Sequence, residues 1–181
     1  MIDEIYQFNK EFVQKNHYTE YITGKYPNKK LAILTCMDTR LIELLPAALG
    51  LKNGDAKIIK NAGAIISHPY GSVVRSLLIA ILTLKVEEIM VIGHTDCGVQ
   101  GLNGEELISL LIQRGISTED ISGLEQAGID FGTWLGGFDS TEESVADAVA
   151  VLKEHPLMPG DVRIRGFIMD SVTGELQEVA G

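Results

Sequence analysis

The sequence predicts an α/β protein with one central, mainly parallel sheet of four or five strands, an antiparallel edge strand and helices on both faces. Short apolar runs alternate with longer segments of helical periodicity, the pattern of crossover connections between parallel strands. Only the turn Thr173-Gly174 separates the last two apolar runs, so the final strand is expected to be antiparallel. The 181 residues suit a single domain and are too few for a (β/α)₈ barrel.

The first 27 residues lie outside this alternation. Ile5, Phe8 and Phe12 fall roughly on one face of a helix predicted over 2–16, and a polar connector follows. We therefore expect one domain over 1–181, with residues 1–27 forming an N-terminal helix and connector. This segment either packs on its own domain or, as we expect, reaches across to pack on a partner subunit.

The remaining elements follow from apolar runs, turns and caps. Strands are predicted at 31–35, 56–60, 88–93, 161–169 and 175–179, and helices at 41–49, 69–85, 104–114, 117–126 and 141–154. Pro69 suits the first turn of its helix. Asn103 with Glu106, and Ser140 with Glu143, resemble capping boxes before two of the later helices.

The composition excludes several classes of protein. An apolar fraction of 45% and a charged fraction of 22% indicate a globular chain rather than a disordered one. The net charge of −10 disfavours a nucleic-acid partner, whose phosphates attract Lys and Arg. No apolar run approaches the roughly 20 residues of a membrane span, and the first residues lack the apolar region of a signal peptide. We expect a cytoplasmic protein with reduced thiols.

Polar residues that suit a metal site follow two of the predicted strands. Cys36 begins the motif Cys-x-Asp-x-Arg after the first strand, and His94 begins His-x-x-Cys after the third. Ligands bind at the carboxyl ends of parallel strands, so Cys36, His94 and Cys97 converge if these strands are neighbours. Two thiolates and one imidazole match zinc with an open fourth position, which is typical of catalytic sites.

Asp38 and Arg40 have two interpretations. Beside zinc, the carboxylate would coordinate the metal or accept a proton from zinc-bound water, and the guanidinium would hold it ionised. Otherwise the two form an exposed salt bridge worth about 0–1 kcal/mol. The two cysteines are likewise open to other interpretations, as small buried hydrophobes or as the nucleophile of a Cys–His pair. A CxxC redox pair, a P-loop and the dinucleotide fingerprint are absent from the sequence.

Three motifs together resemble the β-class carbonic anhydrases of compact prokaryotic type: Cys36-x-Asp38-x-Arg40, Lys60-Asn61-Ala62-Gly63 and His94-x-x-Cys97-Gly98. The resemblance covers about residues 28–100 and returns at 166–168. It implies one Zn²⁺ per subunit held by Cys36, His94 and Cys97, the dyad Asp38–Arg40, and a homodimer or higher homo-oligomer. Lys60 departs from the arginine that is common there, and the two are not interchangeable in bidentate contacts.

The resemblance also implies the reaction, the reversible hydration of CO₂ to bicarbonate and a proton. Zinc-bound hydroxide would attack CO₂, and activity would rise from neutral to alkaline pH. If the Asp38–Arg40 pair breaks, Asp38 would become a fourth zinc ligand. Backbone N–H groups of Ala62, Gly63 or Gly98 are candidates for steadying the substrate, and His68 is a candidate proton shuttle. Hydrolysis of carbonyl sulfide or carbon disulfide at the same zinc, and a non-enzymatic zinc- or bicarbonate-binding role, remain as alternatives.

Overall fold

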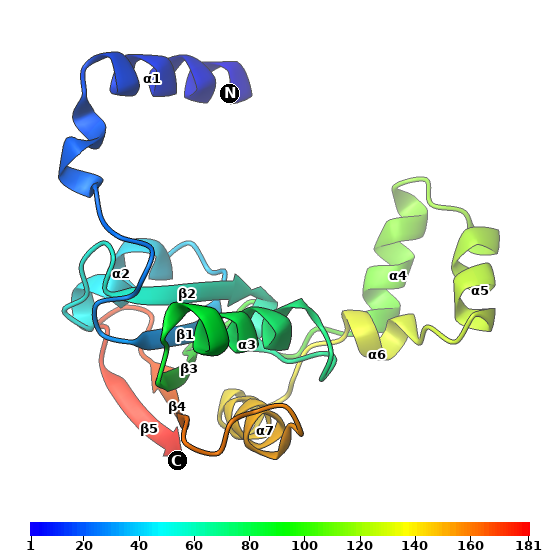
Figure 1. Cartoon of the computed structure of the whole chain (residues 1–181). Coiled ribbons are helices and arrows are strands. Elements are labelled where there is room, and N and C mark those ends of the chain that lie inside the picture. The colour runs from blue at the N-terminus through cyan, green and yellow to red at the C-terminus, as the bar shows by residue number, and fades with distance from the viewer.

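A computed structural model describes residues 1–181 and confirms the predicted fold class. The sheet has five strands in the order β2-β1-β3-β4-β5 (Figure 1). Its strands are β1 (Leu31–Cys36), β2 (Ala56–Asn61), β3 (Glu88–His94), β4 (Arg163–Met169) and β5 (Leu176–Ala180). The first four strands are parallel, and β5 runs antiparallel to β4 at one edge.

The helices agree with the predicted segments to within a few residues, except for one short helix at Phe131–Leu135 that the sequence did not predict. They are α1 (Ile2–Gln14), α2 (Leu41–Ala48), α3 (Ser72–Leu84), α4 (Gly104–Gln113), α5 (Thr118–Gln126), α6 (Phe131–Leu135) and α7 (Thr141–Glu154). The start of α3 was predicted too early, because Gly71 N–H donates to the His68 carbonyl in a turn that contains Pro69. Asn103 and Ser140 cap α4 and α7 as predicted.

Helices cover both faces of the sheet, as expected. On one face, α3 and α7 bury a cluster that includes Leu34 and Val91 of the central strands. On the other face, α2 packs against a second cluster. A Cβ atom at Gly166 of β4 would lie 2.7 Å from a methyl group of Val145, so glycine lets α7 approach the sheet closely.

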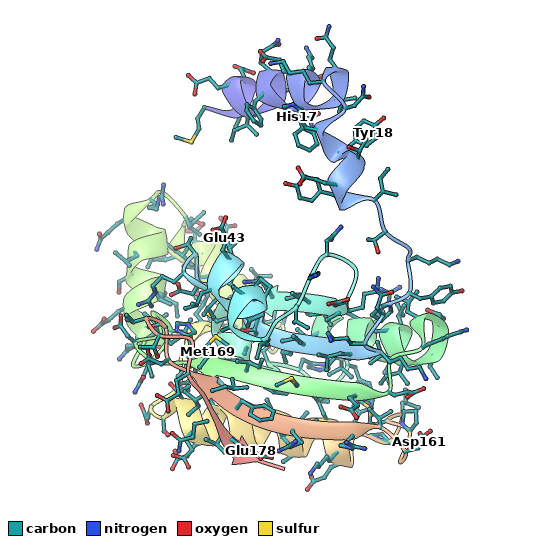
Figure 2. The ribbon with its side chains drawn as sticks, turned by 90° about the vertical axis from the view of Figure 1, so that its left-hand side faces the viewer. His17, Tyr18, Glu43, Asp161, Met169 and Glu178 are labelled. Atoms are coloured by element: carbon teal, nitrogen blue, oxygen red, sulfur yellow. The ribbon has the colours of Figure 1, made fainter.

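Two parts of the chain project from this body. The helix α1, with the 3₁₀ turn η1 (His17–Tyr21), stands apart from the sheet, and Figure 2 shows His17 and Tyr18 on this arm. No residue of α1 is buried. At the opposite end of Figure 1, α4 and α5 stand beyond α6. None of the helices is both long and apolar enough to pass through a membrane.

The strand register determines where the predicted site lies. β1 is the neighbour of β3, with Thr35 opposite Ile92, so Cys36 and His94 end adjacent strands at the carboxyl edge. His94 is in turn opposite Met169, the last residue of β4. In Figure 2 this edge is marked by the Met169 label, and the opposite end of β4 by Asp161. Cys36 and His94, which are 58 positions apart in the sequence, are therefore brought together by one strand pairing.

Candidate metal centre

Cys36, His94 and Cys97 converge at the carboxyl edge of the sheet. All three side chains are buried, and their donor atoms lie within 4.8 Å of one another. The two Sγ atoms are 3.9 Å apart. Two thiolates about 2.3 Å from a tetrahedral zinc ion would be about 3.8 Å apart, whereas a disulfide needs about 2.05 Å. The pair of thiols is therefore spaced for a shared metal ion.

The hydrogen bonds of His94 leave one ring nitrogen free for a metal. Nδ1 lies 2.9 Å from the carbonyl oxygen of Thr95, so Nδ1–H donates there and Nε2 carries the lone pair. The ring is fully buried, and Nε2 has no hydrogen-bond partner. An unpaired buried acceptor is costly, and a metal ion would satisfy it. A backbone carbonyl on the other nitrogen is the usual way to orient a metal-binding histidine. The donor set thus fits zinc.

The two thiols are held in different surroundings. Burial raises the pKa of the Cys97 thiol, and the neighbouring Cys36 adds to the effect, while backbone N–H groups of Val99 and Gln100 oppose it. Gly63 N–H donates to Cys36 Sγ at 3.4 Å. Because zinc binds thiolates, a zinc ion at this site would have to displace the Cys97 proton, so its apparent affinity is expected to rise with pH.

Asp38 presents a carboxylate beside the free nitrogen of His94. Arg40 grips it bidentately, with Nε 3.0 Å from Oδ1 and Nη2 2.9 Å from Oδ2, and the Arg40 backbone N–H also donates to Oδ1. These bonds hold the pKa of Asp38 well below its usual range. Oδ2 lies 3.9 Å from His94 Nε2. An ionised carboxylate therefore lies where it can act on a metal ligand.

The structure adds contacts that the sequence analysis missed. Arg40 also binds Asp96, with Nη1 2.9 Å from Oδ2 and Nη2 2.8 Å from the carbonyl oxygen. The loop after β3 is tied to β4, since Thr95 N–H donates to the Met169 carbonyl and Ser171 N–H donates to Thr95 Oγ1. The acidic side chain in the His94–Cys97 motif is the one sequence signal that could have indicated the first contact.

The remaining predicted residues lie around this centre or away from it. The backbone of Gly63, at φ 76°, brings its N–H to Cys36, and a role for Ala62, Gly63 or Gly98 toward substrate stays a prediction. His68 is exposed, and its Nδ1 accepts from Tyr70 N–H. Its ring lies 6.1 Å from that of Tyr70, and a role for His68 as a proton shuttle stays a prediction.

Lys60, the departure from the family motif, lies near the negative groups of the centre. It lies opposite Thr35 in the register of β1 and β2. Partial burial lowers its pKa, while the charges of Cys36 and Asp38 act in the opposite direction. Lys60 therefore contributes a nearby positive charge, which is the part of an arginine's role that a lysine can keep.

An open groove of about 900 Å³ lies next to the centre, between the loop after β2, α6 and α7. Ala62, Val99 and Phe138 are among the residues that line it. Val99 and Phe138 also pack against the cluster that contains Cys36 and Cys97. Trp134 of α6 lines the same groove, which places this short helix beside the site.

Fold and centre together define an α/β protein with a buried Cys-His-Cys set suited to a soft divalent metal. The family model described as carbonic anhydrase matches residues 31–176. YvdA of Bacillus subtilis, provisionally named a carbonic anhydrase, is 50% identical, over 98% of this chain and 90% of its own. The crystal structure of β-carbonic anhydrase isoform I (TvaCA1) from Trichomonas vaginalis aligns with a TM-score of 0.88 and 31% identity, over 100% of this chain and 98% of that one.

The chain belongs to the β-carbonic anhydrase family, whose members are enzymes of the lyase class. The resemblance that the sequence motifs carry is thereby confirmed. A carbon disulfide hydrolase from Acidianus sp. is also similar, with 32% identity over 87% of this chain and 80% of the hydrolase. The similarity therefore extends to proteins named for two different reactions.

Proposed function

We propose that the protein is a zinc-dependent carbonic anhydrase that interconverts CO₂ with bicarbonate and a proton. The observation that carries this proposal is the buried, unpartnered Nε2 of His94, which faces two thiols and lies 3.9 Å from a carboxylate that Arg40 holds. Membership of an enzyme family favours this reading over a non-enzymatic zinc- or bicarbonate-binding role.

Cys36, His94 and Cys97 would hold one Zn²⁺ per subunit and leave a fourth position open. Zinc bound there supplies the positive charge that lowers the pKa of a coordinated water molecule and makes it nucleophilic. Two thiolates cancel the charge of Zn²⁺, so this pKa falls less far than in a three-histidine site, where it is about 7.

Side chains around the metal position orient the attacking group and hold the substrate. Asp38 is ionised and carries no proton, so it accepts a hydrogen bond from the attacking group and orients it. Arg40 fixes the direction of that carboxylate through two parallel hydrogen bonds. CO₂ offers little to hydrogen-bond, and the apolar side chains of Val99 and Phe138 provide a wall against which it can lie.

A stopped-flow CO₂ hydration assay on the purified protein, with metal analysis, tests the proposal. We expect about one zinc per subunit and a kcat/KM that rises between about pH 7 and pH 9, because a water molecule at the open position would have to lose a proton. A zinc-loaded protein whose kcat/KM falls over that range would contradict the mechanism.

Hydrolysis of carbon disulfide or carbonyl sulfide is the second candidate function. It is favoured by the similarity to the Acidianus protein, and both molecules are linear analogues of CO₂. The same preparation should be assayed for release of hydrogen sulfide from each compound. Sulfide release without CO₂ hydration would assign the protein to this second reaction.

We also propose that residues 1–27 pack on a second copy of this chain. The arm buries nothing of its own, yet Ile5 is 65% exposed and Phe8 is 68% exposed on one face of α1. A helix with an apolar face needs a surface to cover it. A homodimer in which each arm lies on the partner satisfies both copies, in line with the oligomers that the family resemblance implies.

Ile5→Glu is expected to weaken the dimer at least about 100-fold, because it places a charge at the centre of the apolar face of α1. Gln7→Glu is the matched control, since Gln7 lies on the polar side of the same helix and gains the same charge. Sedimentation over a range of concentrations measures both dissociation constants. A dimer that is equally stable in both variants would show that the arm is not in the interface.

A further inference from the structure

Arg40 is held from two sides, and only one of them is the dyad partner Asp38. On the other side Asp96, in the loop between His94 and Cys97, offers both its carboxylate and its carbonyl oxygen to Arg40. Four of the five N–H donors of the guanidinium are thus engaged, two by each aspartate. Arg40 joins the loop after β1 to the loop after β3.

The backbone at Asp96 is set for this contact. Its φ of 54° is in the left-handed region, which costs other residues more than Asn or Asp. In that conformation the carbonyl oxygen and the carboxylate of Asp96 both accept hydrogen bonds from the Arg40 guanidinium. Thr95, the preceding residue, is fixed to β4 through the Met169 carbonyl and Ser171, so the loop that carries Asp96 is anchored.

The hold on Arg40 matters because Arg40 also binds Asp38, which lies beside the candidate metal position. Asp38 Oδ2 is 3.9 Å from His94 Nε2, so little movement separates the carboxylate from the metal position. Released from Arg40, Asp38 would compete for the fourth coordination site as an oxygen ligand. The orientation of Arg40 therefore decides whether that site stays open.

We propose that Asp96 is a positioning residue. By accepting hydrogen bonds from Arg40, it keeps Asp38 bound to Arg40 and away from the metal, so that the fourth coordination position stays open. The inference rests on the proposed function, since it requires zinc at Cys36, His94 and Cys97. The Asp96 side chain is 87% exposed, and exposed ion pairs are weak, so its effect is a modest shift between two arrangements of Asp38.

Azide binding to the cobalt-substituted protein tests the proposal, because azide takes the open position and changes the visible spectrum of Co²⁺. We expect Asp96→Asn to weaken azide binding about two- to fivefold, the range that an exposed ion pair can supply. Asparagine tolerates the left-handed backbone and keeps the carbonyl contact. Glu88→Gln is the control. Glu88 begins β3, the strand that precedes the loop of Asp96, and its carboxylate pairs with Arg163 at 3.1 Å. Azide affinity should be unchanged in it.

A double-mutant cycle separates action through Arg40 from disturbance of the loop. In an Arg40→Ala background, Asp96→Asn should have no further effect on azide affinity. The proposal would be overturned if Asp96→Asn binds azide as tightly as wild type. It would also be overturned if Asp96→Asn weakens azide binding by the same factor in the Arg40→Ala background as in wild type. A wild-type protein without a thiolate-to-cobalt charge-transfer band would instead refute the metal site, and with it the proposed function.

Discussion

Cys97→Ala is expected to lower the zinc content from about one per subunit to below about 0.1, and kcat/KM for CO₂ hydration at least about 1,000-fold. Alanine leaves only Cys36 and His94 as protein ligands, too few for the three-ligand arrangement of a catalytic zinc site. Metal analysis and a stopped-flow assay on the same preparation measure both effects.

Two further variants show that the loss is one of coordination. Cys97 belongs to a buried cluster, so Ala also removes volume from the core. Cys97→Ser nearly keeps the volume and should lose zinc almost as completely, because a hydroxyl is a poor zinc ligand. Met37→Ala alters the exposed neighbour of Cys36 and should bind zinc normally. Full zinc content in Cys97→Ser would contradict the ligand assignment.

The sheet and the convergence of Cys36, His94 and Cys97 could be predicted because their signals are local. A run such as Leu31–Thr35 indicates a buried strand by itself, and parallel strands bring their carboxyl ends together whatever lies between them. The convergence of Cys36 with His94 then depends on a single question of strand order, which the pairing of β1 with β3 answers.

The contacts that orient the ligands could not be predicted in the same way. Arg40 and Asp96 are 56 positions apart, and their meeting depends on loop conformations that no periodicity reports. The bond from Gly63 N–H to Cys36 Sγ depends on a positive φ, and the bond from Ser171 to Thr95 crosses 76 positions. The short helix α6 was missed because five residues are too few to show a helical period.

Asp38→Asn is expected to reduce kcat/KM about 100-fold while zinc content stays near one per subunit. Asparagine keeps the shape of the side chain but presents an uncharged amide, and Arg40 loses its bidentate anionic partner. Asp55→Asn is the matched control. The pKa of Asp55 is also lowered, chiefly by the Lys52 N–H. Asp55 directly precedes β2, at the end of the strand opposite to the metal centre, so this substitution should leave catalysis unchanged.

Asp38→Asn is also expected to change how the free energy of unfolding depends on pH. The pKa of Asp38 is lowered in the folded protein, first by the side-chain bonds from Arg40 and then by its backbone N–H. A lowered folded pKa stabilises the protein above the unfolded value of about 3.9, and this contribution is lost as pH falls through the folded pKa. Asp38→Asn should therefore unfold more easily than wild type at neutral pH, and the difference should shrink in strong acid.

Denaturant titrations of both proteins at neutral pH and in acid measure that convergence. A variant that loses activity while its unfolding free energy stays equal to wild type at every pH would mean that the Asp38–Arg40 bonds are weak in solution. Loss of zinc together with activity would make Asp38 a metal ligand rather than an orienting base. Activity that falls with zinc retained and with the acid convergence present would support a carboxylate that is ionised by Arg40 and acts beside the metal.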